Sequence, residues 1–103
     1  MIKETKKQNT MEYNNEDLKN LKGLYLIDFY ADWCGPCKMM GQILDQMDIN
    51  IIKVNVDINE DLAKEYKVMS IPNMVLLKDG EEVNRFIGFT PRSIIEQEIE
   101  KFK

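Results

Sequence analysis

The residues best suited to chemistry are Cys34 and Cys37, the only two cysteines in the 103-residue chain. They stand in the segment Trp33-Cys34-Gly35-Pro36-Cys37, which follows an apolar run directly. Two thiols separated by two residues can close a small disulfide ring and open it again, and neither can drift away while the other reacts. The spacing therefore predicts a reversible dithiol that passes a pair of electrons.

The composition narrows the class of protein. The chain has no histidine, which excludes a Cys-His nucleophile pair, a histidine metal site and a histidine pH switch. A zinc or iron–sulfur site needs four ligands, so with two cysteines only a site shared between chains remains open. The net charge of −4 argues against nucleic acid or an anionic membrane as the main partner.

The length suits one domain with a core of its own. We expect residues 1–103 to form a single domain in which residues 1–10 are frayed or form a weak edge strand. The N-terminal segment lacks the apolar stretch of a secretory signal, and no apolar run is long enough to span a bilayer. A cytoplasmic protein is therefore expected, in which a lone cysteine pair is more often catalytic than structural.

The pattern of apolar residues predicts alternating strands and helices. The predicted strands are 24–30, 51–56, 74–77 and 83–87, and Asp79-Gly80 predicts a hairpin between the last two. Four helices are predicted. The first runs from a cap at Asn14 or Asn15 to Leu21, and the second begins at about Cys34. The third follows a cap at Asn59, and the last follows Thr90 as its cap, with Pro91 in the first turn. Parallel strands joined by helical crossovers, plus one hairpin, predict an α/β fold with a central mixed sheet and helices on both faces.

Two of these helices carry apolar stripes that predict their inward faces. The stripe of the helix after Cys34 consists of Cys37, Met40, Leu44 and Met47, with Ile43 beside them. The stripe of the last helix consists of Ile94, Ile95, Ile99 and Phe102.

The motif and its surroundings resemble the thioredoxin family over about residues 13–102. The matching segments, in chain order, are Asp28 to Ala31, Trp33 to Lys38, Lys53 to Asp57, Ile71-Pro72 followed by Lys78 to Gly80, and Gly88. A lone Cys-x-x-Cys would be weak evidence, whereas five matches in order are specific. The resemblance implies a thioredoxin-like fold and a protein-disulfide reductase that needs no cofactor beyond its own Cys34–Cys37 disulfide.

The two cysteines are expected to have different roles. Cys34 should be the attacking thiolate, because the unpaired N–H groups of a helix N-terminus favour an anionic sulfur. Cys37, one turn further in, should resolve the mixed disulfide. The dipeptide Gly35-Pro36 adds no positive charge beside the thiolate, which points to a reductant.

Two charged residues are candidates for the proton transfer. Asp28 lies within a buried strand, where a carboxylate is costly. The resemblance implies that it accepts the Cys37 proton, through water, and the alternative is an exposed aspartate at a strand end. Lys53 either pairs with Asp28 as a buried cation or is a solvated lysine at the sheet edge.

The resemblance also implies a shallow apolar groove for a substrate. Pro72 is cis in the family and lies opposite the disulfide, where the Ile71 backbone meets a substrate strand; an ordinary trans proline is the alternative. Trp33, Gly88 and Phe89 would complete the groove, with core packing left open for Phe89. The chain departs from the family at Gly41-Gln42, where a proline is usual, at the short segment 48–50, and at Ser70.

The implied partners are disulfide-containing client proteins and a thioredoxin reductase, usually a flavoenzyme that draws on NADPH. Neither nucleic acid nor a membrane is expected to bind, and the protein is expected to be a monomer. Two alternatives remain: a thioredoxin-like protein dedicated to one reductase or one client, and a binding subunit whose thiols are incidental.

Overall fold

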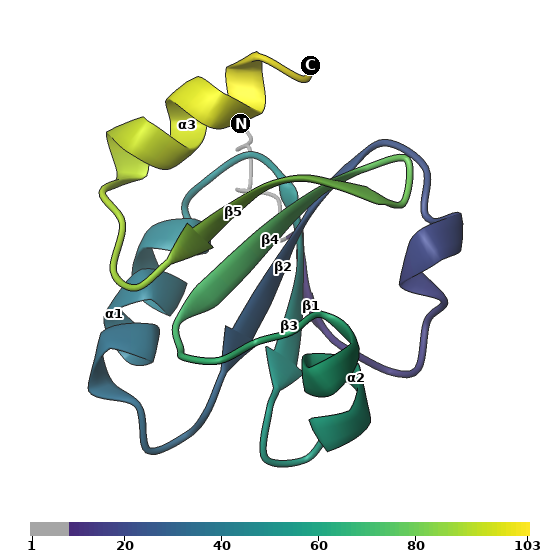
Figure 1. Cartoon of the computed structure of the whole chain (residues 1–103). Helices are drawn as coiled ribbons and strands as arrows, with labels where there is room; N and C mark the ends of the chain where they lie inside the picture. The colour runs from purple at the N-terminus through teal and green to yellow at the C-terminus, as the bar shows by residue number, and fades with distance from the viewer. Residues whose placement is uncertain (1–8) are drawn as a thin grey trace, which may run out of the picture.

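Five strands form one mixed sheet in the order β1-β3-β2-β4-β5 (Figure 1). The strands are β1 (Thr10–Glu12), β2 (Leu24–Tyr30), β3 (Asn50–Asn55), β4 (Asn73–Lys78) and β5 (Glu81–Ile87). β1, β3 and β2 run parallel, whereas β4 and β5 are antiparallel to their neighbours. This computed structural model describes residues 9–103, so the expectation of a frayed segment or weak edge strand over residues 1–10 lies almost wholly outside the described part. The observed edge strand β1 begins at Thr10, the last residue of that range.

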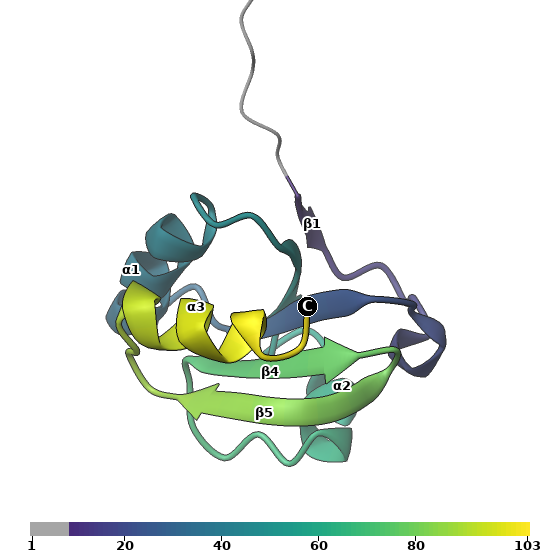
Figure 2. The same cartoon turned by 90° about the horizontal axis from the view of Figure 1, so that it is seen from above.

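Helices cover both faces of the sheet, as predicted. Within residues 9–103 they are a single 3-10 turn, η1 (Leu18–Asn20), and the α-helices α1 (Gly35–Leu44), α2 (Glu60–Glu65) and α3 (Arg92–Glu100). α1 and α3 lie on one face and α2 on the other, as Figures 1 and 2 show. The predicted α/β class is therefore confirmed.

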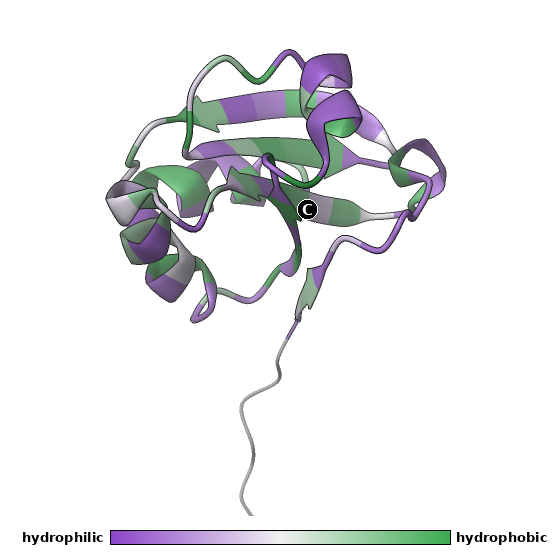
Figure 3. Ribbon diagram, turned by 90° about the horizontal axis from the view of Figure 1, so that it is seen from below, coloured by the Kyte–Doolittle hydropathy of each residue, from purple (hydrophilic) through white to green (hydrophobic). Residues whose placement is uncertain are grey.

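The alternation of side chains along β2 divides the core in two. Leu26 packs with Met40 of α1 and Ile95 of α3, whereas Ile27 and Phe29 belong to the cluster on the other face. Figure 3 shows hydrophobic stretches on the strands of the sheet, interspersed with hydrophilic ones. β2 is thus buried on both faces, which explains its nearly continuous apolar sequence.

The first predicted helix is wrong in extent. Only the turn η1 forms: Asn15 has a φ of 65°, and the backbone of Asp17 and Leu21 is extended, so no α-helix runs through these residues. Asp17, rather than Asn14 or Asn15, caps the turn by accepting a hydrogen bond from the Lys19 N–H at 3.2 Å.

Two other helix starts also differ from prediction. Thr90 does not cap α3: its hydroxyl donates to the Gly88 carbonyl at 3.1 Å, and Pro91 occupies the cap position in extended backbone. Asn59 stands at the cap of α2, but its amide donates to the Asn55 carbonyl instead of accepting a helix N–H. Short polar side chains near a helix start bond to whichever backbone group the local turn presents.

The predicted stripes hold for α1 and in part for α3. Cys37, Met40 and Leu44 are buried, and Met47 is buried just beyond the end of α1. On α3, Ile95 and Ile99 are buried, whereas Ile94 is exposed. The strands agree with prediction to within one residue, except that β5 begins at Glu81 instead of Val83.

Candidate functional site: a dithiol at a helix N-terminus

The two cysteines form a disulfide at the start of α1. Cys34 is the N-cap residue, Cys37 lies in the first turn, and their Cα atoms are 5.2 Å apart. The backbone N–H of Cys37 donates a hydrogen bond to Cys34 Sγ at 3.2 Å. The Cys34 sulfur therefore lies where the unpaired N–H groups and the dipole of the helix favour negative charge.

Both cysteines are largely buried, with 5% of Cys34 and 2% of Cys37 exposed. They pack with Ala31, and Ile71 lies against the same small cluster. Pro36 stands in the first turn of α1, where its missing N–H costs no hydrogen bond. Gly35 and Pro36 are exposed and complete the cap without adding a charge.

Asp28 is buried on β2, on the same sheet face as α1, with 1% of its surface exposed. The alternative of an exposed aspartate is therefore excluded. Neither carboxylate oxygen has a hydrogen-bond partner among the described residues. The pKa of Asp28 is raised to about 6. Burial is the largest cause, the charge of Lys53 lowers the pKa, and the charges of Asp45 and Glu12 add to the rise.

Lys53 lies opposite Asp28, in register on the neighbouring strand β3. β3 is flanked by β1 and β2, so the alternative of a lysine at the sheet edge is wrong. The Lys53 ammonium lies 4.7 Å from the centre of the Tyr30 ring. A Cβ atom on Gly41 would come within 3.3 Å of Lys53 Nζ, so the glycine leaves room for the ammonium beneath α1.

Of the residues predicted to form the substrate groove, Trp33 and Phe89 are exposed at the surface. Trp33 is 70% exposed, and its indole N–H donates to Asp57 Oδ2 at 2.9 Å. The Ile71–Pro72 peptide bond is cis, as the resemblance implied. Phe89 is 48% exposed, so core packing does not explain it.

Gly88 connects the end of β5 to the segment that precedes β4. It has a φ of 84°, a conformation that favours glycine, and its N–H donates to the Pro72 carbonyl at 2.7 Å. The hydrogen bond ties the end of β5 to the proline that opens β4. The exposed Met69, two residues before Ile71, is a further apolar side chain that the sequence interpretation missed.

Two residues near Asp28 were also missed. Glu12 of β1 pairs in register with Lys53, and Tyr30 Oη donates to both carboxylate oxygens of Glu12, at 2.9 and 3.2 Å. Burial and the nearby Glu12 carboxylate raise the pKa of Tyr30 to about 12. No local motif signals these contacts, because they depend on which strand lies beside β3.

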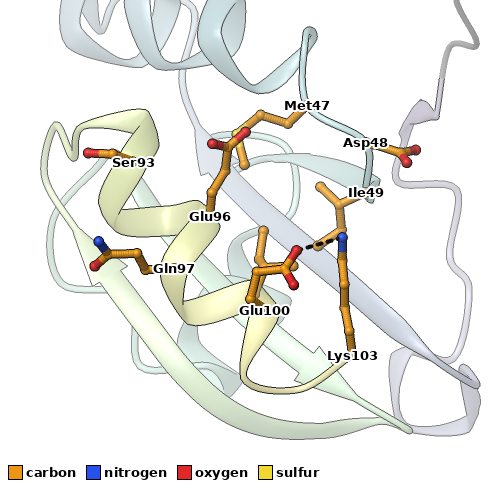
Figure 4. Close-up of a pocket in the computed structure, with 9 residues that line it drawn as sticks. Met47, Asp48, Ile49, Ser93, Glu96, Gln97, Glu100 and Lys103 are labelled. Carbon is orange, nitrogen blue, oxygen red and sulfur yellow. Dashed lines mark ion pairs between the residues drawn. The ribbon is translucent and has the colours of Figure 1, made fainter.

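The pocket in Figure 4 is separate from the disulfide. It has a volume of about 480 Å³ and lies between α3 and the residues that follow α1. Met47, Ile49 and Ile99 line it together with Asp48, Glu96 and Glu100, and Glu100 forms an ion pair with Lys103 at 3.1 Å. Since Cys34 stands at the opposite end of α1, we assign this pocket no part in the dithiol chemistry.

Among residues 9–103, no three acidic or cysteine side chains stand together in a way that could hold a metal ion. No helix within the same range has the length and apolar character needed to cross a membrane.

Comparisons with known proteins agree on one family. A family model described as thioredoxin matches residues 4–101. The chain is 42% identical over 86 residues to the thioredoxin of Bacillus subtilis, covering 78% of this chain and 83% of that protein. It is 40% identical over 94 residues to the thioredoxin of Staphylococcus saprophyticus, covering 85% and 90%. Among solved structures, thioredoxin NaTrxh from Nicotiana alata is similar with a TM-score of 0.83 and 31% identity, covering 98% of each chain.

Proposed function

The chain belongs to the thioredoxin family of redox-active protein-disulfide reductases, and from that premise we propose the roles of its residues in the exchange. The observation that carries the proposal is the Cys34–Cys37 disulfide at a helix N-terminus, with a buried carboxylate on the strand that leads into it. A dithiol in this setting can be opened and closed without metal or organic cofactor.

In the first step, the Cys34 thiolate attacks one sulfur of a client disulfide. A bond forms between Cys34 Sγ and that sulfur, the client S–S bond breaks, and the other client sulfur leaves as a thiolate that takes up a proton. The Cys37 N–H bond to Cys34 Sγ supports this assignment, because it stabilises negative charge on that sulfur. The same stabilisation makes Cys34 a good leaving group in the second step.

In the second step, Cys37 Sγ attacks Cys34 Sγ and releases the client as a second thiolate. The two electrons lost by the pair have then reduced one client disulfide to two thiols. The Cys37 thiol must lose its proton first, and we assign the acceptor role to Asp28, acting through water. A carboxyl with a pKa of about 6 is ionised at neutral pH and is a stronger base than an ordinary aspartate.

Client binding is proposed on the surface around the disulfide. The exposed rings of Trp33 and Phe89 provide apolar contacts, and the Ile71 backbone, next to the cis Pro72, can pair with an extended client segment. Gly88 holds this edge in place through its bond to the Pro72 carbonyl. A shallow surface of this kind suits many protein clients, so we propose a general reductase in place of one dedicated to a single client.

The direction of electron flow is also proposed. Members of the family act on disulfide clients and are reduced by thioredoxin reductase. We propose that the reductase for this chain is an NADPH-dependent flavoenzyme, and that the chain works as a monomer in the reducing cytoplasm. The uncharged Gly35-Pro36 dipeptide supports the reducing direction, since no positive charge stabilises the dithiol form.

The direct test is the rate at which the protein accelerates reduction of a disulfide-containing test protein by dithiothreitol. The intact chain should accelerate it, and Cys34→Ser should remove the acceleration. If both forms leave the rate at its uncatalysed value while the chain still binds a partner protein, the thiols are incidental and the binding-subunit alternative holds.

A further inference from the structure

Three charged residues form one row across three adjacent strands. Glu12 of β1 pairs in register with Lys53 of β3, and Lys53 pairs in register with Asp28 of β2. Residues paired in register present their side chains to the same face of a sheet. The row therefore runs acid, base, acid from the exposed edge strand to the buried carboxylate.

Tyr30 holds the exposed end of this row. It lies two residues after Asp28 on β2, so its side chain belongs to the same face. Its hydroxyl donates to both oxygens of Glu12, at 2.9 and 3.2 Å, and Lys53 Nζ lies 4.7 Å from the centre of its ring. One side chain thus contacts both the cation and the outer acid of the row.

α1 packs over Lys53 and limits the space available to its ammonium group. Gly41 would bring a Cβ atom within 3.3 Å of Lys53 Nζ, so the ammonium lies close beneath the helix backbone. The cation is therefore confined between the Tyr30 ring and α1, and the Lys53 residue stands in register between the acidic residues Glu12 and Asp28.

We propose that Glu12 and Tyr30 are positioning residues for the exchange reaction. They fix a negative charge on the far side of Lys53, which reduces the electrostatic stabilisation of the Asp28 carboxylate by the lysine. The carboxylate therefore stays basic enough to take the Cys37 proton at neutral pH. The inference rests on the proposed role of Asp28 as the proton acceptor.

The charges that face Asp28 are consistent with this arrangement. Lys53 on β3 lowers the pKa of Asp28, whereas Asp45, after α1, and Glu12 on β1 raise it. On the remaining neighbour, β4, Asp28 pairs with the uncharged Met74. Glu12 is therefore a surface-accessible group through which the basicity of the buried site can be changed without altering its packing.

The test compares the full-length variants Glu12→Gln and Tyr30→Phe with the control Asp48→Asn. Asp48 is an exposed acid at the distant pocket, and its replacement changes the net charge as Glu12→Gln does. The titration of the Asp28 carboxyl carbon is followed by NMR, and the pH profile of the resolution step is followed by single-turnover release of the client thiol. Glu12→Gln keeps an oxygen for Tyr30 and removes the charge, whereas Tyr30→Phe keeps the ring and removes the hydroxyl.

Glu12→Gln should lower both midpoints by about 0.3 to 0.6 pH units, the effect of one charge about two strand spacings away at an effective dielectric constant of about 40 to 80. Tyr30→Phe should lower them by less, and Asp48→Asn should leave them in place. Midpoints in Glu12→Gln that match the Asp48→Asn control, or that rise, overturn the inference. If Glu12→Gln shifts the titration of Asp28 but leaves the pH profile of the resolution step in place, Glu12 affects the carboxyl but has no part in the exchange reaction.

A separate variant distinguishes this failure from that of the proposed mechanism. If Asp28→Asn resolves the mixed disulfide as fast as the intact chain, Asp28 is not the proton acceptor and the positioning role falls with it. If Asp28→Asn resolves the mixed disulfide slowly but Glu12→Gln behaves like the Asp48→Asn control, the proposed role of Asp28 stands. Only the positioning role of Glu12 and Tyr30 is then overturned.

Discussion

Asp28 lies directly opposite Lys53 on the adjacent parallel strand, yet burial still raises the pKa of the carboxyl to about 6. The lysine charge lowers that pKa but does not outweigh desolvation, which is the largest contribution. The site therefore contains a carboxylate that is unstable relative to solvent and basic enough to act near neutral pH. Stability and chemistry should respond to it in opposite directions.

Asp28→Asn is expected to stabilise the protein at pH 8 and to slow resolution by Cys37. The folded pKa of about 6 exceeds the ordinary value of 3.8, so the contribution of Asp28 to stability is fully present below pH 3.8 and is lost as pH rises through 6. Above that window the buried charge costs about 3 kcal/mol, which the amide avoids. Chemical denaturation at pH 8 should show most of this gain, and at pH 3.5 almost none. Equal gains at both pH values would contradict the assignment of the cost to the buried charge.

Pro36→His tests whether the dipeptide between the cysteines sets the direction of electron flow. A histidine beside Cys34 can donate a charge-assisted hydrogen bond to the thiolate, an interaction of about 1.5 to 3 kcal/mol. Since the dithiol form gains this energy, the reduction potential should rise by roughly 30 to 60 mV. Equilibration with glutathione buffers measures the potential. A potential that stays the same or falls would contradict the electrostatic account of the motif.

Phe89→Ser tests the client groove. Loss of the ring should raise the KM for a disulfide-containing test protein several-fold while kcat and the reduction potential stay the same, because the dithiol is untouched. Met11→Ser is the matched control: Met11 is 48% exposed, as Phe89 is, but lies on β1 at the opposite edge of the sheet. An equal rise in KM in both variants would mean that general surface hydrophobicity, and not the groove, is responsible.

Gly41→Ala tests the confinement of Lys53. An alanine inside a helix ordinarily stabilises by about 1 kcal/mol relative to glycine. Here the new methyl group would lie 3.3 Å from Lys53 Nζ, so the gain should be smaller or absent. In a Lys53→Met background the full gain should return, and a double-mutant cycle by chemical denaturation measures the difference. Equal gains in both backgrounds would show that the ammonium moves aside freely.

The elements that could be predicted are those with strong local patterns. Leu24–Tyr30 was predicted to the residue, because a nearly continuous apolar run bounded by Gly23 and Asp32 has few alternatives. The caps of η1 and α3 were not, because the φ of Asn15 and the partner of Thr90 depend on how the neighbouring loops close.

The residues of the site likewise divide into those that a local sequence motif identifies and those that depend on tertiary structure. The cysteine pair and Asp28 stand in contiguous motifs, so their positions could be inferred from the residues and the family resemblance. Glu12 and Tyr30 could not be assigned, because their contact depends on the register of β1 against β3, two segments separated by about 40 residues in sequence. The register of a short, largely exposed strand such as β1 is only weakly specified by its sequence.

The most direct test of the two-step exchange is to mix reduced Cys37→Ser and reduced Cys34→Ser with a disulfide-containing client and analyse the products by mass spectrometry under non-reducing conditions. Cys37→Ser should attack the client and then stall, giving a stable mixed disulfide of one chain and one client through Cys34. Cys34→Ser should give little adduct. If Cys34→Ser forms the adduct and Cys37→Ser does not, the assigned roles of the two cysteines are reversed and the account is contradicted.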